Sequence, residues 1–454
     1  MKRQFILPLF VFSLMFLQYS CTPELKVPEP SAGNANFSKS IAIGGDFLTG
    51  YQDGALYAKG QRLSIPALLA EQFKLVGGSN FNQALMPDES GLGLGGVPWG
   101  QPFFSSFHLG YKTDCQHVTS LNPLNTVITI GNATPYLTGI AGNSIQNLAI
   151  PFASTANYFN PGFGMSFSSG NRNPYYNRIA SNPGVSTLYS DAKAQNATFI
   201  TAWLGMEDIY NYASSGGAGA PIPSAATLSS RLDSIIGGLT AKGAKGVLAT
   251  IPDFRDFPYY TLVAWNAANM SQVQADSLND VWNNIAGYMQ IHFNAGNNGF
   301  IIRDASVSNG GLRQLHSGEY ITLSVPLDSM KCFKYGLIQN LINDYYALDS
   351  SEVFTIDQAI SAYNSIITQK AAQYDFALAD ISSFMKSVKK GITWDGVGFN
   401  AEFVTGGFFS LDGYHPNQKG YALIANEFIK AINTKYQAAI PLTNCVECDG
   451  VKFP

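Results

Sequence analysis

The stretch Ser410-Leu411-Asp412-Gly413-Tyr414-His415-Pro416 lies near the end of the chain and is followed at once by a helix-like segment over 417–436. Asp412 stands three residues before His415, on a turn whose Pro416 suits the first position of a helix. This spacing allows a carboxylate to orient an imidazole, which is the acid and base part of a hydrolytic triad. We therefore expect a site at this turn, and a nucleophile and an oxyanion hole must be sought elsewhere in the chain.

Composition limits the classes of partner and the number of domains. With 454 residues the chain is too long for one minimal core, which predicts one large domain with insertions or two domains. Charged residues make up 13%, about half of the usual share of roughly 25%, so the surface must rely on neutral polar groups. The net charge of -4 supplies no basic field that would gather phosphates, and we expect no nucleic-acid partner.

The N-terminus has the form of an export signal. Lys2 and Arg3 precede an apolar run over 5–17, which is short for a membrane span, and Ser20 stands directly before Cys21. We expect 1–20 to be a lipoprotein signal peptide, Cys21 to be lipidated with palmitate, and 21–38 to be a tether rich in Pro, Ala and Ser. An ordinary secretory signal cut nearby is the alternative.

The expected export of the chain also determines how the remaining cysteines are interpreted. Cys115, Cys332, Cys445 and Cys448 are expected to form structural disulfides, because disulfides persist in oxidising compartments. Zinc binding and a redox role for Cys445-x-x-Cys448 are the weaker alternatives, and so is a metal pair at Cys115-x-His117.

Strand and helix signals alternate along most of the chain. We expect strands at 40–44, 146–150, 198–204, 245–251 and 376–381, and helices at 64–75, 185–196, 228–242, 355–374 and 417–436. Such alternation predicts a parallel sheet covered on both faces. Two segments interrupt the pattern and are predicted insertions, near 77–140 and 254–351.

Several polar or aromatic pairs follow directly after predicted strands. They are Asp46-Phe47, Pro151-Phe152, Glu207-Asp208 and the segment from Asp412 to His415. In open parallel sheets the ligand lies at the carboxyl ends of the strands. We therefore expect these residues to converge on one site.

Four of these segments resemble the sequence blocks of the SGNH (GDSL-type) hydrolases. Residues 43–51, Ile-Gly-Gly-Asp-Phe-Leu-Thr-Gly-Tyr, are similar to the first block, G-[DN]-S-L-T-x-G, with Phe47 where the family has its nucleophilic serine. Residues 147–152 resemble the second block, with Phe152 at the oxyanion-hole glycine, and residues 204–208 resemble the third block, with Glu207 at the oxyanion asparagine. Asp412 and His415 match the fifth block, and the likeness is greatest to the bacterial lipoprotein branch of the family.

The resemblance implies a fold and a division of the chain. The expected architecture is α/β, a three-layer α/β/α sandwich with a central parallel, flavodoxin-like sheet that carries large insertions. This SGNH-like domain would span 39–440, followed by a cysteine-containing tail over 441–454.

The substitutions in these blocks argue against the family's chemistry. A phenyl ring at Phe47 cannot attack a carbonyl, Phe152 adds bulk where a backbone N–H must be approached, and Glu207 would place a carboxylate near developing negative charge. We expect Phe47 and Phe152 to stack together and fill the former pocket, with Asp412 and His415 left as a structural pair.

Three alternatives keep an active site. Thr49 is a candidate substitute nucleophile, and a shift of register would bring in Ser64 or Ser410. The four residues Asp46, Glu207, Asp412 and His415 could also form an acid/base or metal site.

These observations lead to one expected function and two alternatives. The expected function is a catalytically inactive, lipid-anchored protein of the bacterial outer membrane, which binds or scaffolds an outer-membrane β-barrel or a multi-subunit membrane assembly, with no cofactor and no metal. One alternative is an esterase or deacylase that uses His415 and Asp412 with an unconventional nucleophile. The other is a non-catalytic module that binds acyl chains or glycans.

Overall fold

The computed structural model describes residues 29–94, 102–140, 145–165, 173–285, 291–304, 307, 311–338 and 340–454. The predicted signal peptide, Cys21 and the first part of the predicted tether lie outside these residues. None of the helices in the described part of the chain is both long and apolar enough to span a bilayer.

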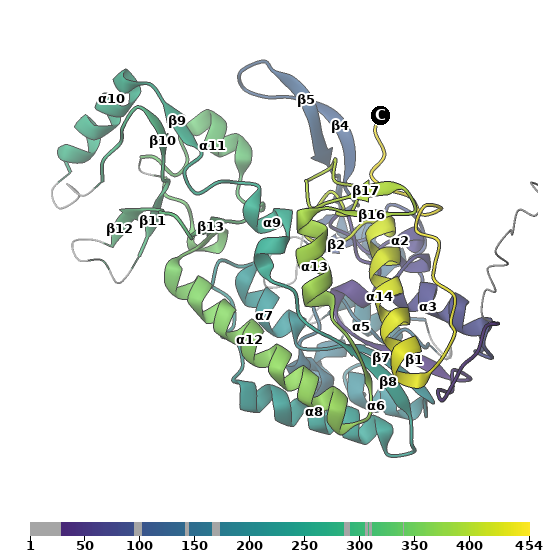
Figure 1. The fold of residues 1–454 in the computed structure, drawn as a ribbon. Coiled ribbons are helices and arrows are strands. Elements are labelled where there is room, and N and C mark those ends of the chain that lie inside the picture. The colour runs from purple at the N-terminus through teal and green to yellow at the C-terminus, as the bar shows by residue number, and fades with distance from the viewer. Residues whose placement is uncertain are drawn as a thin grey trace, which may run out of the picture.

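A parallel sheet forms the centre of the fold (Figure 1). Its strands are β1 (Ser40–Gly44), β7 (Phe199–Trp203), β8 (Lys245–Ala249) and β15 (Ala377–Ala379), in the spatial order β1-β7-β8-β15. The apolar residues of β1 and β7 are buried without alternation, as expected for a parallel sheet covered on both faces. All four strands fall within ranges that the sequence predicts.

The fifth predicted strand, 146–150, runs alongside β1 on the side away from β7. Ala42 N–H donates to Gln146 O at 2.9 Å, and the N–H groups of Leu148 and Ile150 donate to Ala42 O and Gly44 O at 2.9 and 3.1 Å. In chain order the sheet therefore reads 2-1-3-4-5, which is the flavodoxin-like order.

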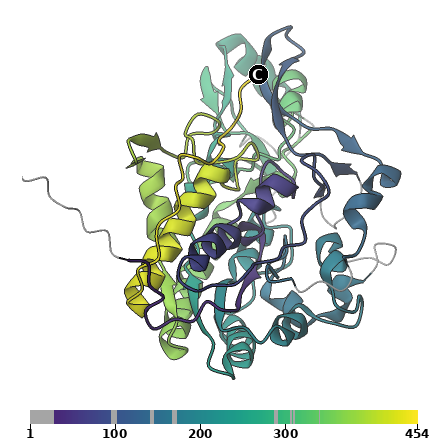
Figure 2. The same cartoon turned by 90° about the vertical axis from the view of Figure 1, so that its right-hand side faces the viewer.

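Helices cover both faces of this sheet. On one face α3 (Ile65–Lys74) packs beside α14 (Gln418–Tyr436), as Figure 2 shows, and on the other face α8 (Ala225–Thr240) packs against α12 (Ser350–Gln373). The start of α3 is set locally, because the Ser64 side chain accepts the Ala67 N–H and Pro66 occupies the first turn. The predicted three-layer α/β/α architecture is confirmed.

The remaining elements connect or extend these layers. The other α-helices of the described residues are α2 (Ala58–Arg62), α4 (Ile130–Leu137), α5 (Pro174–Ile179), α6 (Leu188–Ala194), α7 (Met206–Ala213), α9 (Pro258–Thr261), α10 (Gln272–Asn283), α11 (Leu327–Phe333) and α13 (Ile381–Lys390). The other strands are β2 (Gly93–Leu94), β3 (Phe103–Phe104), β4 (His108–Thr113), β5 (Thr119–Leu124), β6 (Val127–Ile128), β9 (Ala268–Met270), β10 (Gly296–Asn298), β11 (Ile301–Arg303), β12 (Leu312–Gln314), β13 (Tyr320–Ile321), β14 (Ala347–Leu348), β16 (Ile392–Trp394) and β17 (Val397–Phe399).

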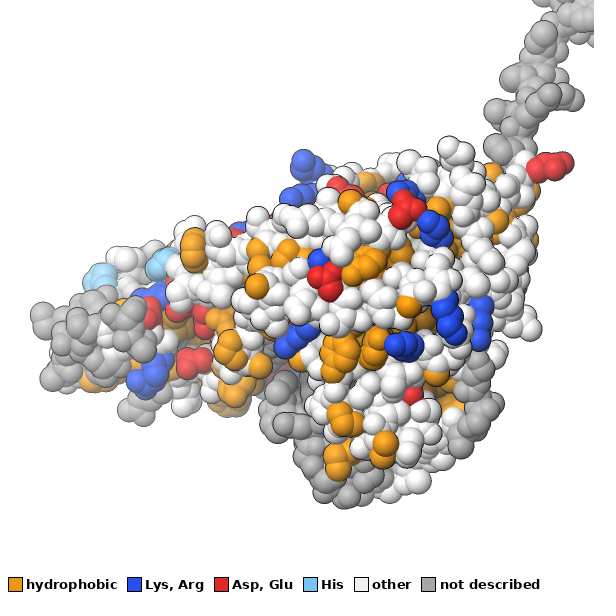
Figure 3. Space-filling view, turned by 90° about the horizontal axis from the view of Figure 1, so that it is seen from below, with side chains coloured by type: hydrophobic (Ala, Val, Ile, Leu, Met, Phe, Trp, Pro, Cys, Tyr) orange, Lys and Arg blue, Asp and Glu red, His pale blue; other side chains and the backbone are white. Residues whose placement is uncertain are grey.

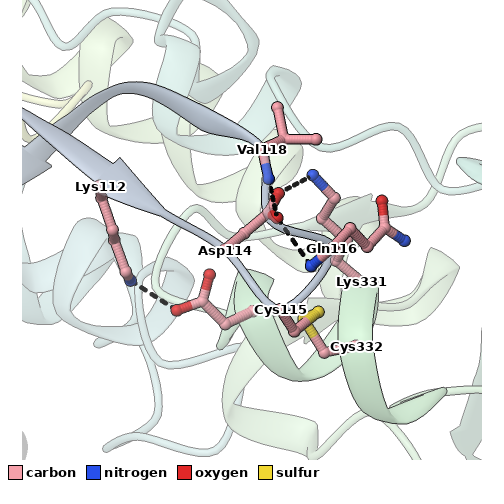
Figure 4. Close-up of a disulfide and its surroundings, with 8 residues drawn as sticks. Lys112, Asp114, Cys115, Gln116, Val118, Lys331 and Cys332 are labelled. Carbon is pink, nitrogen blue, oxygen red and sulfur yellow. Dashed lines mark hydrogen bonds and ion pairs between the residues drawn. A yellow bond between two sulfur atoms is a disulfide. The ribbon is translucent and has the colours of Figure 1, made fainter.

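The first predicted insertion contains a projecting hairpin, β4–β5, which the weak sequence periodicity did not reveal. A disulfide joins Cys115, in the hairpin loop, to Cys332 in α11 (Figure 4). Ion pairs from Lys112 to Asp328 and from Lys331 to Asp114 accompany it. The expectation of a structural disulfide is thus confirmed for this pair, which ties the first insertion to the second across 217 residues of sequence.

The second insertion builds a small core of its own, separate from the core around the sheet (Figure 1). Its buried members include Trp282, Phe293, Ile301 and Ile321. Within this lobe the Arg313 guanidinium binds the Glu319 carboxylate at 2.7 Å and Asp304 at 2.6 Å.

The C-terminal tail returns along α14, where the Asn426 side chain binds both the N–H and the carbonyl of Thr443. Cys445 and Cys448 in this tail are buried free thiols, so the second disulfide is not present in the structure. Figure 3 shows, on the face that it draws, charged side chains alone or in small groups within a surface that is mostly uncharged, in keeping with the low charged fraction of the sequence.

Candidate functional site

The turn that carries Asp412 and His415 is fixed by the Asp412 carboxylate. Its Oδ1 accepts the backbone N–H groups of Tyr414 and His415 at 2.9 and 2.8 Å, and its Oδ2 accepts the Gly54 N–H at 3.0 Å. The same Oδ2 lies 2.9 Å from His415 Nδ1. Asp412 therefore orients the imidazole as the sequence predicts, and it also closes the turn ahead of α14.

His415 Nε2, the atom that would face a nucleophile, faces a carboxylate instead. Asp46 follows β1, and its Oδ2 lies 3.4 Å from His415 Nε2. The other oxygen, Oδ1, accepts the backbone N–H of Phe152. Asp46 thus contacts both the expected base, His415, and the expected oxyanion donor, the backbone N–H of Phe152.

The two carboxylates determine the charge of the imidazole. Burial alone would lower the pKa of His415, but the charges and hydrogen bonds of Asp412 and Asp46 outweigh burial and raise that pKa to about 9. The Asp412 carboxyl, whose pKa burial acts to raise, is held below its ordinary pKa by His415. At neutral pH His415 is therefore an imidazolium, which has no lone pair free to accept a proton.

Phe47 lies where the nucleophile is expected, and it is part of an aromatic cluster. Only 2% of its surface is exposed, and its ring centroid lies 5.3 Å from those of Trp203 and His415 and 5.5 Å from that of Tyr414. The ring contacts of Phe152 are with Tyr51 and Tyr175 instead. The expectation that Phe47 and Phe152 stack on each other is therefore wrong, although both rings contribute to filling the region.

The reason why Phe152 turns away is its backbone. Its φ of +66° lies in the left-handed region, which few non-glycine residues adopt and which suits the glycine found at this place in the SGNH block. In this conformation the Phe152 N–H points to Asp46 Oδ1. The expected donor is retained, but it is already engaged by a side chain of the protein.

Glu207 occupies the first turn of α7 and contacts the same loop. Its Oε1 accepts the Asp46 backbone N–H at 2.9 Å. Burial, and next the charge of Asp46, raise the pKa of Glu207 well above its ordinary value. Burial and the charge of Asp46 thus disfavour the negative charge that is expected at this position.

Gly45 makes room for this carboxyl group. A Cβ built on Gly45 would lie 1.8 Å from Glu207 Oε1. A side chain at position 45 therefore excludes the observed position of Glu207, and the two residues are matched.

The hydroxyl groups weighed as substitute nucleophiles have other structural roles. Thr49 Oγ1 donates to Asp46 O at 2.6 Å, Ser64 caps α3, and Ser410 Oγ accepts the Asp53 N–H at 3.0 Å. None of the three is a hydrogen-bond partner of His415 Nε2 among the described contacts.

Asp53 is a member of the site region that sequence reasoning missed. Its Oδ1 accepts the Leu411 N–H at 2.9 Å and its Oδ2 accepts the Tyr57 hydroxyl at 2.8 Å. Burial raises the pKa of Asp53 to about 6, because no cation pairs with it directly. The Asp-Gly pair at 53–54 marks a turn in the sequence, but only the fold shows that this turn braces the Asp412 turn.

The structure brings Asp46, Glu207, Asp412 and His415 together, as the sequence predicts. Asp46 follows β1 and Glu207 follows β7, but the expectation that Asp412 and His415 also follow a strand of the sheet is wrong, because they lie on the turn before α14. Within the described residues, however, no group of three or more His, Cys, Asp or Glu side chains is arranged to hold a metal ion. Cys115 is in a disulfide, so the metal pair Cys115-x-His117 is excluded.

Comparison with family models identifies the family of the chain. The model for the GDSL-like lipase/acylhydrolase family matches residues 135–428, which is more than half of the chain. The chain belongs to the GDSL-like lipase/acylhydrolase family. A comparison with curated proteins gave no match.

The GDSL family match includes Phe152, Glu207, Asp412 and His415 and begins after the segment 43–51. Phe47 lies in that unmatched segment, yet β1 places it at the carboxyl end of the sheet beside His415. The chain thus combines a GDSL-family fold with a site whose base is paired to two carboxylates and whose nucleophile position holds a phenyl ring.

Proposed function

We propose that this GDSL-family protein is catalytically inactive and acts as a binding or scaffold subunit of a bacterial outer-membrane assembly. The observation that carries the proposal is the surrounding of His415 Nε2, which meets the Asp46 carboxylate at 3.4 Å and the buried ring of Phe47. In this position a hydrolase needs a hydroxyl or thiol whose proton the imidazole removes.

Each requirement for acyl transfer meets a separate obstacle. The base is protonated at neutral pH, the Phe152 N–H already binds Asp46, and Glu207 binds the Asp46 backbone. The loss of one oxyanion donor alone costs roughly 10² to 10³ in rate. Since Asp46 and His415 are each about 5% exposed, a substrate also has no direct access to them.

Ester hydrolysis tests the inactive part of the proposal. The mature chain with Cys21→Ser is compared with its His415→Ala and Phe47→Ser variants on short and medium acyl esters, from pH 6 to 10. We expect the Cys21→Ser chain and its His415→Ala variant to hydrolyse the esters no faster than buffer without protein. Wild-type turnover that is lost in His415→Ala would contradict inactivity and would favour the esterase or deacylase alternative.

Labelling separates a hidden serine nucleophile from none. A fluorophosphonate probe reacts covalently with activated serines, so we expect no label on the wild-type chain. Labelling that disappears in Ser410→Ala or Ser64→Ala would mean that a serine enters the site in solution.

Surface composition supports the scaffold part of the proposal. The surface is poor in charge, and a separate lobe and a disulfide-tied hairpin project from the sheet domain. Large, mostly neutral surfaces suit protein partners, and a filled site speaks against a module that holds an acyl chain or a glycan in the old cleft.

The location and partner have their own test. The N-terminal pattern up to Cys21 supports a lipid anchor in the outer membrane. Radiolabelled palmitate should be incorporated by the wild-type chain and not by Cys21→Ser. Gentle solubilisation of membranes followed by affinity purification should recover a membrane complex, and recovery of the free protein alone would contradict the scaffold role.

A further inference from the structure

A buried arginine lies outside the site described above. Arg178, in α5, is 5% exposed. Its donors bind only neutral acceptors: Nη1 binds Ala84 O at 3.3 Å and Met86 Sδ at 3.1 Å, Nη2 binds Leu85 O at 3.1 Å, and Nε reaches Thr138 O at 3.4 Å. The guanidinium is hydrogen-bonded, but its charge is not neutralised by these groups.

No carboxylate of the described residues lies within ion-pair distance of Arg178. The segments between 95 and 339 that fall outside the described residues contain no Asp or Glu, so they cannot supply one. Other well-buried or half-buried arginines of the chain do have acidic partners: Arg231 with Asp208, Arg255 with Asp253 and Asp357, and Arg313 with Asp304 and Glu319. A buried cation without a counter-charge is costly, and burial lowers the pKa of Arg178 accordingly.

Arg178 also borders a small cavity. The cavity has a volume of about 30 Å³, and its polar lining includes Arg178, Gln61, Gln83 and Asn147. Thr49, which binds the Asp46 carbonyl, and the segment 149–151 also line the cavity. One water needs roughly 10–15 Å³ by this measure, so the cavity has room for about two waters, or for one halide ion.

Size and charge together define the ligand. The amide groups that line the cavity have partners within the protein: Asn147 Nδ2 donates to Leu48 O at 3.1 Å and to Gln83 Oε1 at 2.9 Å, and Gln61 Nε2 donates to Ala84 O at 2.9 Å. The four hydrogen bonds of Arg178 use four of its five N–H donors and leave the second Nη2 hydrogen available. A sulfate, a phosphate or a carboxylate-bearing metabolite exceeds the space that two waters fill.

We propose that this cavity is a halide site, in which chloride provides the counter-charge of Arg178. The ion links α5 and the segment 84–86 to Thr49 and the segment 149–151. It stabilises the folded protein, and it takes no part in the proton chemistry of His415. The proposal does not depend on whether the protein is inactive or on its location.

Anomalous diffraction tests the site directly. Crystals of the wild-type mature chain grown in sodium bromide are measured at the bromine absorption edge. We expect an anomalous peak in the cavity, within hydrogen-bonding distance of the Arg178 guanidinium. Bromide peaks at the surface only, with the cavity holding water, would overturn the proposal.

Thermal unfolding tests the site at ordinary concentrations. The melting temperature is measured in sodium chloride from 1 to 200 mM, with sodium gluconate keeping the ionic strength constant. We expect a saturable rise of about 2–4 °C that bromide reproduces. A flat response, or a response only at molar chloride, would mean binding at crystal concentration only and would overturn the proposal.

Matched variants assign the effect to Arg178. Arg178→Met should remove the chloride dependence, whereas Arg62→Met, at an exposed arginine, should keep it. If Arg178→Met does not fold, the chloride, bromide and gluconate comparison on the wild type still decides the outcome.

Discussion

The two halves of the GDSL-type site differ in what they retain. The acid and base half, Asp412 and His415, keeps both residue types and the hydrogen bond between them. The nucleophile and oxyanion half keeps its place in the fold but has Phe47, Phe152 and Glu207 at the three chemical positions. The difference separates contacts that the fold itself uses from groups that only the family's chemistry requires.

Asp412 explains why the first half remains. Its carboxylate accepts three backbone N–H groups, from Gly54, Tyr414 and His415, and it also binds the His415 ring. Removing it would leave buried donors without partners, which is destabilising in any protein. The Asp-His pair is therefore compatible with a purely structural role, and its presence in a sequence does not by itself indicate an enzyme.

The largest effect is expected at Phe47, the buried ring at the nucleophile position of the second half. Phe47→Ala removes a buried ring from contact with Trp203, Tyr414 and His415, and it should lower the free energy of unfolding by about 3–5 kcal/mol. Urea denaturation measures this change. Phe354→Ala, at a ring that is 64% exposed, is the control and should change stability by less than about 0.5 kcal/mol.

A loss below about 1 kcal/mol in Phe47→Ala would show that the ring is not packed as described. The nucleophile position would then be open in solution, and the contrast between the two halves would fail.

A somewhat smaller effect on stability is expected from pH, because the His415 imidazolium contacts Asp412 in the first half of the site and Asp46 in the second. The folded pKa of about 9 lies above the ordinary value of about 6.5, so His415 stabilises the fold fully below pH 6.5 and loses this contribution as the pH rises through 9. The free energy of unfolding should fall by about 3 kcal/mol between pH 6.5 and 9.5.

Variants separate this effect from general alkaline destabilisation. Asp46→Asn removes one of the two negative charges, so the decrease between pH 6.5 and 9.5 should shrink. His292→Ala changes an exposed histidine and should leave the profile as in the wild type. An unchanged profile in Asp46→Asn would mean that Asp46 does not hold the imidazolium.

The smallest effect concerns the match between Gly45 and Glu207. Gly45→Ala forces the Glu207 carboxyl away from the Asp46 N–H, which should cost about 1–3 kcal/mol. In a Glu207→Ala background the same change should cost far less, and a double-mutant cycle measures the difference. Additive costs would show that the two positions are independent.

Periodicity and capping residues were sufficient to predict the sheet domain. Ser64 with Pro66 predicted the start of α3, and the unbroken apolar runs predicted β1 and β7, because these signals are local. The hairpin β4–β5 was missed because most of its residues are exposed or half-buried, which leaves no clear alternation of apolar and polar residues. The separate core of the second lobe depends on contacts between short segments that carry little periodicity.

The site was predictable in position but not in state. Asp46 and Glu207 converge because each follows a strand of the parallel sheet, whereas Asp412 and His415 reach the same edge on the turn before α14. Burial and backbone conformation decide the rest: burial beside Asp46 raises the pKa of Glu207, and Phe152, whose φ is positive, has ring contacts with Tyr51 and Tyr175 rather than with Phe47. Neither property is encoded in a motif, and the same holds for the absence of an acidic partner at Arg178.

The central claim is that His415 is held as an imidazolium between Asp412 and Asp46 and cannot act as a base. NMR titration of the His415 ring in histidine-labelled protein measures this state directly, with His415→Gln used to assign the signal. The account predicts that His415 remains protonated at pH 7 and titrates near pH 9. A His415 that is neutral at pH 7, with a pKa at or below about 6.5, would contradict it and would reopen the question of an active hydrolase.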